Sequence, residues 1–187
     1  METLIILIIA LGLAMDCFSL AITNSSLSGE VKDGIPLQTA IIFALGHFIL
    51  LFAGYWLAGL LENTFTGLEG WAAFVVFTII GLKMIREAKK RRPEAKVFDI
   101  NNVRVIVIMA LAASMDAFLA GLALGILNSR LYPAAFMITL AVFLFTLSGL
   151  VAGNRFGLEF AKRTSIFGGV FMFIAAIHYL LGFVLAI

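Results

Sequence analysis

Cysteine and charged residues are both scarce in this chain, and each shortage excludes a class of protein. The single cysteine, Cys17, excludes an internal disulfide framework and any metal site built from several cysteines. Only 13% of the 187 residues are charged and 63% are hydrophobic, whereas soluble domains have about 25% charged and about 45–50% apolar residues. The composition therefore predicts a membrane protein without a soluble catalytic domain.

Long apolar runs fill most of the sequence. A helix needs about 20 apolar residues to cross a bilayer, so the chain has room for six crossings joined by short connectors. The acidic start and Asp16 within the first run argue against a cleaved secretory signal, so this run is expected to be retained. We predict an all-α membrane protein in which residues 1–187 form a single transmembrane domain. The six predicted transmembrane helices span residues 3–23, 37–60, 69–86, 103–127, 132–154 and 165–187.

Basic residues are concentrated on one side of the predicted membrane. The connectors after the first, third and fifth helices hold 12 of the 13 Lys and Arg residues, eight of them between Lys83 and Arg104. Because Lys and Arg collect on the cytoplasmic side, we expect a cytoplasmic connector at 86–104 and extracytoplasmic termini. The run KKRRPEAK is interpreted as this topology signal rather than as a specific site for anionic lipid or a partner.

Two stretches of sequence 100 residues apart are similar. LGLAMDCFSLAI (11–22) and LAASMDAFLAGL (111–122) share a leucine and the M-D-x-F pattern, and weaker matches at an offset of 95 pair residues 71–85 with 166–180. An odd number of crossings in each half turns the second half over in the membrane. The chain is therefore predicted to consist of two inverted three-helix repeats, residues 1–95 and 100–187, as in many transporters.

Asp16 and Asp116 are the two of eleven carboxylates that lie inside apolar runs. An aspartate at this depth costs about 2.5–3.5 kcal/mol, so it normally faces water, a cation or a partner. Their symmetric placement suggests one shared mid-membrane site. Two close carboxylates repel each other unless a cation or proton compensates, which favours cation binding coupled to protonation. Two structural aspartates hydrogen-bonded within the bundle are the alternative.

Other polar residues lie near the depth of this pair. Ser19 shares the helical face of Asp16. His47 is a candidate ligand or proton carrier, or else a hydrogen-bonded structural histidine. The predicted metal ligands are therefore Asp16, Asp116, His47 and Ser19. Further hydroxyls supply a secondary polar pathway, although such groups often bond to the backbone; these are Thr78, Thr139, Thr146 and Ser148.

The small residues and the neighbours of the aspartates are interpreted structurally. Met15, Cys17 and Met115 point away from the aspartate face and are expected to pack in the bundle. Lys83 lies near a helix end and is expected to snorkel to water. Small residues at helical spacing allow close helix packing; these are Gly12, Ala113, Ala117, Gly121 and Gly125.

With AMDCF at 14–18 and SMDAF at 114–118, the sequence resembles the MntP family of manganese efflux pumps, within the lysine-exporter (LysE) superfamily. The resemblance covers nearly the whole chain, including six spans, a basic third connector and the pair Gly168-Gly169. It implies export of Mn²⁺ across the bacterial cytoplasmic membrane, with Asp16 and Asp116 at the aspartates of the family motif.

Two positions depart from the family pattern. Family members typically carry a carboxylate or amide in the second helix and an acidic residue at the start of the sixth, where this chain has His47 and Ser165. Mn²⁺ prefers oxygen ligands, whereas imidazole suits zinc, iron or nickel. A divergent branch of the family, with a different metal, is therefore an open alternative.

Together these observations predict a secondary transporter that exports a divalent cation, Mn²⁺ first, and that needs no cofactor. Its expected partners are membrane lipid, the transported cation and protons, and not nucleic acid. Export of another small solute, such as an amino acid, is the alternative. Two aspartates could also form an intramembrane protease, but the GxGD pattern of such enzymes is absent, so no enzyme activity is expected.

Overall fold

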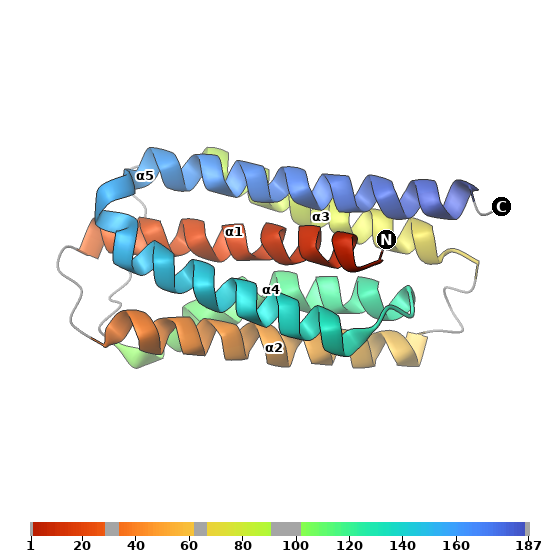
Figure 1. Cartoon of the computed structure of the whole chain (residues 1–187), viewed down its shortest axis with the longest axis horizontal. Coiled ribbons are helices and arrows are strands. Elements are labelled where there is room, and N and C mark those ends of the chain that lie inside the picture. Colours follow the sequence, from red (N-terminus) through yellow and green to blue (C-terminus); the bar gives the residue numbers. More distant parts are fainter. Residues whose placement is uncertain (1, 29–33, 62–66, 91–101, 186–187) are drawn as a thin grey trace.

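The computed structural model describes residues 2–28, 34–61, 67–90 and 102–185. Over these ranges the chain is entirely helical outside short turns, and its helices lie side by side as a bundle (Figure 1). The helices are α1 (Glu2–Ser28), α2 (Ile35–Leu61), α3 (Glu69–Lys90), α4 (Val103–Ile126) and α5 (Leu131–Leu185). Because α5 is bent into two helical arms, the described part of the chain contains the six helices predicted from the sequence.

The bend in α5 lies at Gly157, whose backbone angles are φ 68° and ψ 173°. This conformation is accessible almost only to glycine, because a Cβ would clash with the backbone. After the bend, the second arm runs back in the opposite direction, with α1 between the two arms in the view of Figure 1. The predicted start of the last helix at residue 165 is wrong, since the helix continues from Gly157 through Lys162. Residues 158–164 lie outside the predicted helix because they include charged side chains, although lysine and glutamate are good helix formers.

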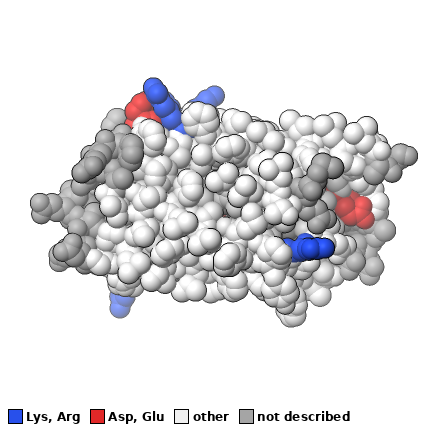
Figure 2. All heavy atoms as spheres, viewed as in Figure 1, with Lys and Arg blue, Asp and Glu red and all other residues white. Residues whose placement is uncertain are grey.

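Five helical segments are long and apolar enough to cross a membrane: α1, α2, α4, and the α5 arms Leu131–Val151 and Gly157–Leu185. Within the described residues, α3 is not in this set, and its C-terminal half carries Lys83, Arg86 and Glu87. On the face shown in Figure 2, charged side chains lie towards the two ends of the bundle and the middle is uncharged. The protein is thus a multi-pass membrane protein.

The central helix of the bundle is α1. It packs against both arms of α5, with Phe18 against Gly149 of the first arm and Gly12 against Gly168 of the second. A Cβ on Gly12 would lie 3.3 Å from the Gly168 carbonyl oxygen and 2.8 Å from Met172 Cε. This close packing places the middle of α1, including Asp16, in the interior of the bundle.

α2 and α4 approach each other closely, and glycines allow it. A Cβ on Gly54 would collide with the backbone carbonyl of Phe118, and one on Gly121 with the backbone carbonyl of Leu51. Gly125 lies further along the same contact, where a Cβ would be 2.9 Å from the Tyr55 carbonyl oxygen. Since backbone atoms cannot be repacked like side chains, these positions hold the two helices at a fixed separation.

Gly54→Val should therefore destabilise the protein, because the added side chain forces α2 away from α4. Overpacking of this kind typically costs about 1–3 kcal/mol. We expect a lower unfolding temperature for the purified variant in detergent, measured by scanning fluorimetry. Gly59→Val is the matched control on the same helix, since a Cβ at Gly59 meets nothing within 4 Å. Equal losses in the two variants would contradict this account.

Candidate functional site

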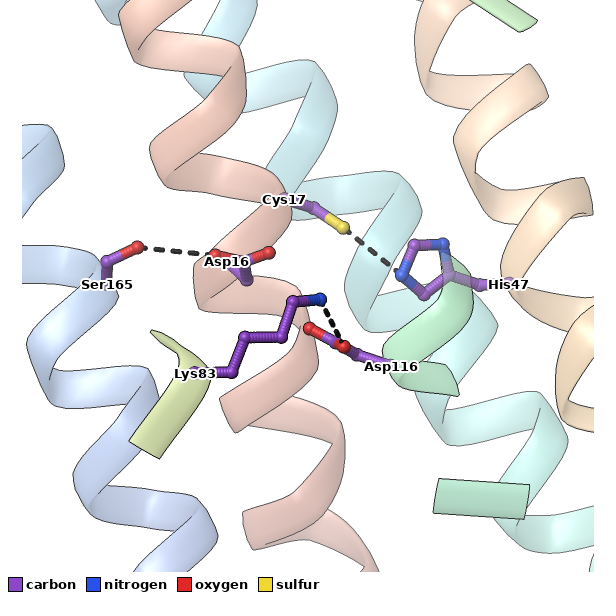
Figure 3. A network of polar contacts seen from close by, with 6 residues as sticks. All are labelled: Asp16, Cys17, His47, Lys83, Asp116 and Ser165. Atoms are coloured by element: carbon purple, nitrogen blue, oxygen red, sulfur yellow. Dashed lines mark hydrogen bonds and ion pairs between the residues drawn. The ribbon is translucent and has the colours of Figure 1, made fainter. Parts of the chain in front are cut away.

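The two intramembrane aspartates are brought together in the bundle interior. Asp16 comes from α1 and Asp116 from α4, and their exposed fractions are 6% and 2%. They are close enough to interact electrostatically with each other, and Figure 3 shows both beside Lys83 of α3. Two acidic side chains 100 positions apart in the sequence therefore belong to one polar cluster.

Lys83 is part of this cluster. Its Nζ donates a hydrogen bond to Asp116 Oδ1 at 2.6 Å, forming an ion pair. The prediction that Lys83 snorkels to water is wrong, because its stem carries the charge inward to a carboxylate whose side chain is only 4% exposed. A buried charge without a partner is far more costly than a paired one. The sequence shows Lys83 as a cation inside the predicted third helix, but the carboxylate that it meets comes from α4 and is seen only in the structure.

Ser165 holds the other carboxylate. Its hydroxyl, on the second arm of α5, donates to Asp16 Oδ1 at 3.3 Å, and the residue is fully buried. In the sequence, Ser165 stands out only as a departure from the family pattern. In the structure, that departure lies directly at the site, and it leaves a neutral hydroxyl where an acidic residue would add a third negative charge.

His47 lies in a neighbouring cluster on α2. Its Nδ1 is 3.0 Å from the Phe43 carbonyl and 2.9 Å from Ser114 Oγ, and its Nε2 is 3.4 Å from Cys17 Sγ. The Phe43 carbonyl can only accept, and the Ser114 hydroxyl donates to the Ala110 carbonyl. The hydrogen-bond network thus assigns the proton of the neutral ring to Nδ1 and leaves Nε2 to accept from the Cys17 thiol.

The histidine cluster adjoins the aspartate cluster without merging with it. Cys17, which was predicted only to pack, joins them, because it follows Asp16 on α1 and contacts His47 (Figure 3). Within the described part of the chain, no three His, Cys, Asp or Glu side chains lie close enough together to hold a metal ion in this conformation. His47 and the carboxylates would have to move together to share one.

The other predicted polar residues are dispersed. Ser19 donates to the Ala161 carbonyl at 2.6 Å, and Ser148 to the Phe145 carbonyl at 3.0 Å. The Thr146 hydroxyl is buried beside Cys17. Two further hydroxyls are buried and make no hydrogen bond to described residues; they belong to Thr78 and Thr139.

The predicted packing residues lie inside the bundle. Gly12 contacts the second arm of α5, while Gly121 and Gly125 contact α2. Ala113 and Ala117 are buried core residues on the same helix as Asp116.

The contact between Cys17 and His47 can be tested by thiol labelling, since Cys17 is the single cysteine of the chain. His47→Ala removes the ring that covers the sulfur, so maleimide should label Cys17 several-fold faster in the folded protein. His178→Ala is the control, because His178 lies away from Cys17 and contacts Tyr179. Identical labelling rates in the two variants would show that His47 does not shield the thiol.

Comparison with known proteins shows the family of the chain. A family model described as "Putative manganese efflux pump" matches residues 30–180. A protein of Desulfitobacterium hafniense is 32% identical over 181 residues, covering 97% of this chain and 95% of its own. One of Methanosphaera stadtmanae is 32% identical over 178 residues, covering 95% and 98%. Both carry the name "Putative manganese efflux pump MntP".

A third relative with that name, from Crocosphaera subtropica, is 32% identical over 175 residues and covers 93% of each chain. No solved structure matches the chain. The family is one of transporters and not of enzymes. Because the family model covers most of the chain and the relatives match over nearly the full length, the protein belongs to the MntP family of manganese efflux pumps.

Proposed function

We propose that this protein exports Mn²⁺ and that Asp16 and Asp116 together form the anionic core of its cation site. The observation that carries the proposal is the meeting of two buried carboxylates from different helices. Membership of a family of manganese efflux pumps supports the choice of ion. Without a cation, two such charges would repel each other in a medium that screens them poorly.

The donor atoms at the pair support a hard divalent cation. Mn²⁺ prefers carboxylate, carbonyl and water oxygens, whereas imidazole and thiolate suit softer metals. The hydroxyl of Ser165, which donates to Asp16, is again an oxygen. His47 and Ser19, the two other predicted ligands, would first have to leave their bonds to Cys17 and to the Ala161 carbonyl. The favoured first site is therefore built from oxygens, with water completing the coordination.

Transport follows from the position of the pair between the two halves of the chain. In our proposal, six helices cross the membrane as two inverted repeats (1–95 and 100–187) within one domain. Asp16 then belongs to the first repeat and Asp116 to the second. If the halves rock against each other, the site faces each side in turn, as in other transporters of this design. Protons returning to the emptied carboxylates are a natural coupling partner, because they restore neutrality.

Asp16→Asn and Asp116→Asn should each abolish Mn²⁺ transport into proteoliposomes, since Asn retains the shape of Asp but removes its charge. The double variant should be little worse than either single one, because residues acting as a unit are non-additive. Near-normal transport by one single variant would contradict a shared site.

The control for this series is Glu159→Gln, which removes an exposed carboxylate paired with Arg163 at 3.8 Å. Its transport should match the wild type. All variants are first compared for folding by size-exclusion chromatography in detergent. If both aspartate variants fail to accumulate in the membrane while the control accumulates, the aspartates are structural.

The proposed topology places 12 of the 13 basic residues on the cytoplasmic side. This requires extracytoplasmic termini and a cytoplasmic connector at 86–104, which lies largely outside the described residues. A cysteine introduced at Ala95 should resist an impermeant maleimide in intact cells and react after permeabilisation, whereas one introduced at Thr3 should react in both. Labelling of residue 95 from outside would reverse the orientation.

A further inference from the structure

Lys83 lies at the proposed cation site, although it belongs to no predicted ligand set. Its ammonium is 2.6 Å from Asp116 Oδ1, and it also interacts electrostatically with Asp16 (Figure 3). It comes from α3, while the two aspartates come from α1 and α4. A cation built into the chain thus occupies the position at which a transported cation would meet Asp116.

Charge balance makes the ammonium and a divalent ion competitors. Two carboxylates carry two negative charges, so one bound divalent ion neutralises them completely. If Lys83 remained in place, the site would hold a surplus positive charge, with two cations close together in poorly screening surroundings. The ammonium also uses a carboxylate oxygen of Asp116 that a metal would require. Binding of the metal is therefore opposed by the ion pair.

The structure offers the displaced ammonium a second position. The Lys83 side chain is 38% exposed, whereas that of Asp116 is 4% exposed. Lys83 also lines a hollow of about 390 Å³ on the outer side of α3, together with Ile79, Leu82, Arg86 and Glu87. Glu87 follows Lys83 by one helical turn and already attracts it. A rotation of the flexible stem would move the charge from Asp116 towards Glu87 without moving the helix.

We propose that Lys83 is a tethered counter-cation: it neutralises the Asp16–Asp116 pair while no metal is bound, and an entering divalent cation displaces it towards Glu87. The inference rests on the proposed function, in which the two aspartates hold Mn²⁺. The counter-cation role also explains how the bound metal can be released, because the returning ammonium competes with it for the same carboxylate.

The displacement can be followed directly in the wild-type protein. Purified full-length protein is treated with an amine-reactive reagent with and without saturating Mn²⁺, and labelling is quantified by peptide mass spectrometry. Lys89, exposed on the same helix, is the internal reference. The ratio of Lys83 to Lys89 labelling should rise several-fold with Mn²⁺, and it should already be high without Mn²⁺ in Asp116→Asn. An unchanged or lower ratio when Mn²⁺ is bound would overturn the proposal.

Binding affinity provides a second measurement. Removal of the competing charge in Lys83→Met should lower the Mn²⁺ Kd, measured by calorimetry, by roughly tenfold. Lys83→Arg keeps the charge and should bind Mn²⁺ more weakly than Lys83→Met, whereas the control Lys89→Met should retain the wild-type Kd. Weaker or unchanged binding by Lys83→Met would overturn the proposal, and the labelling experiment decides the matter if that variant does not fold.

The two proposals fail differently. If Asp16→Asn and Asp116→Asn abolish Mn²⁺ binding but the extent of Lys83 labelling in the wild type does not change with Mn²⁺, only the counter-cation role is wrong. If the wild type binds no Mn²⁺, or if the aspartate variants bind it normally, the carboxylate site itself is wrong and the counter-cation role falls with it.

Discussion

Two carboxylates buried in one membrane protein interior must be compensated by nearby charge or hydrogen bonds, and the arrangement of the helices meets this requirement. Asp116 receives the ammonium of Lys83 and Asp16 receives the hydroxyl of Ser165. These partners come from α3 and from the second arm of α5, so four helical segments converge on the pair. Any movement that separates these helices would take the carboxylates away from their partners and change the balance of charge between them.

Small residues make this convergence possible. Gly54 and Gly121 let the backbones of α2 and α4 meet, and Gly12 lets α1 approach the second arm of α5. In a membrane, apolar side chains gain little by leaving lipid for protein, so tight van der Waals contact between backbones carries much of the association. The glycines therefore help to bring together the helices that carry the polar side chains.

The separation between the aspartate pair and the His47 cluster has a chemical consequence. Asp16 accepts from the Ser165 hydroxyl and Asp116 from the Lys83 ammonium, while the softer nitrogen and sulfur of His47 and Cys17 face each other. Since Nε2 of His47 accepts from the thiol, the imidazole is occupied by a partner inside the protein. In our proposal, the carboxylate oxygens suit a hard cation, while the imidazole that would favour zinc or nickel is engaged with Cys17.

The sequence by itself determined the class of protein, its six helices, its family and the pair of aspartates in apolar segments. These follow from local properties, namely the length of apolar runs, the cost of a charge in hydrocarbon and the repeated M-D-x-F motif. It also predicted His47 and Ser19 as metal ligands, a role that no contact in the structure tests.

Only the tertiary structure decided the partners of those aspartates. Snorkelling was a reasonable expectation for Lys83, because a single helix offers its charge nothing better than water. The packing of α3 against α4 brings a buried carboxylate within reach of the ammonium. Ser165 and Cys17 acquire their contacts in the same way, from residues on other helices. Such pairings depend on the rotation and separation of neighbouring helices, and these are set by packing across the whole bundle rather than by the residues of any one segment.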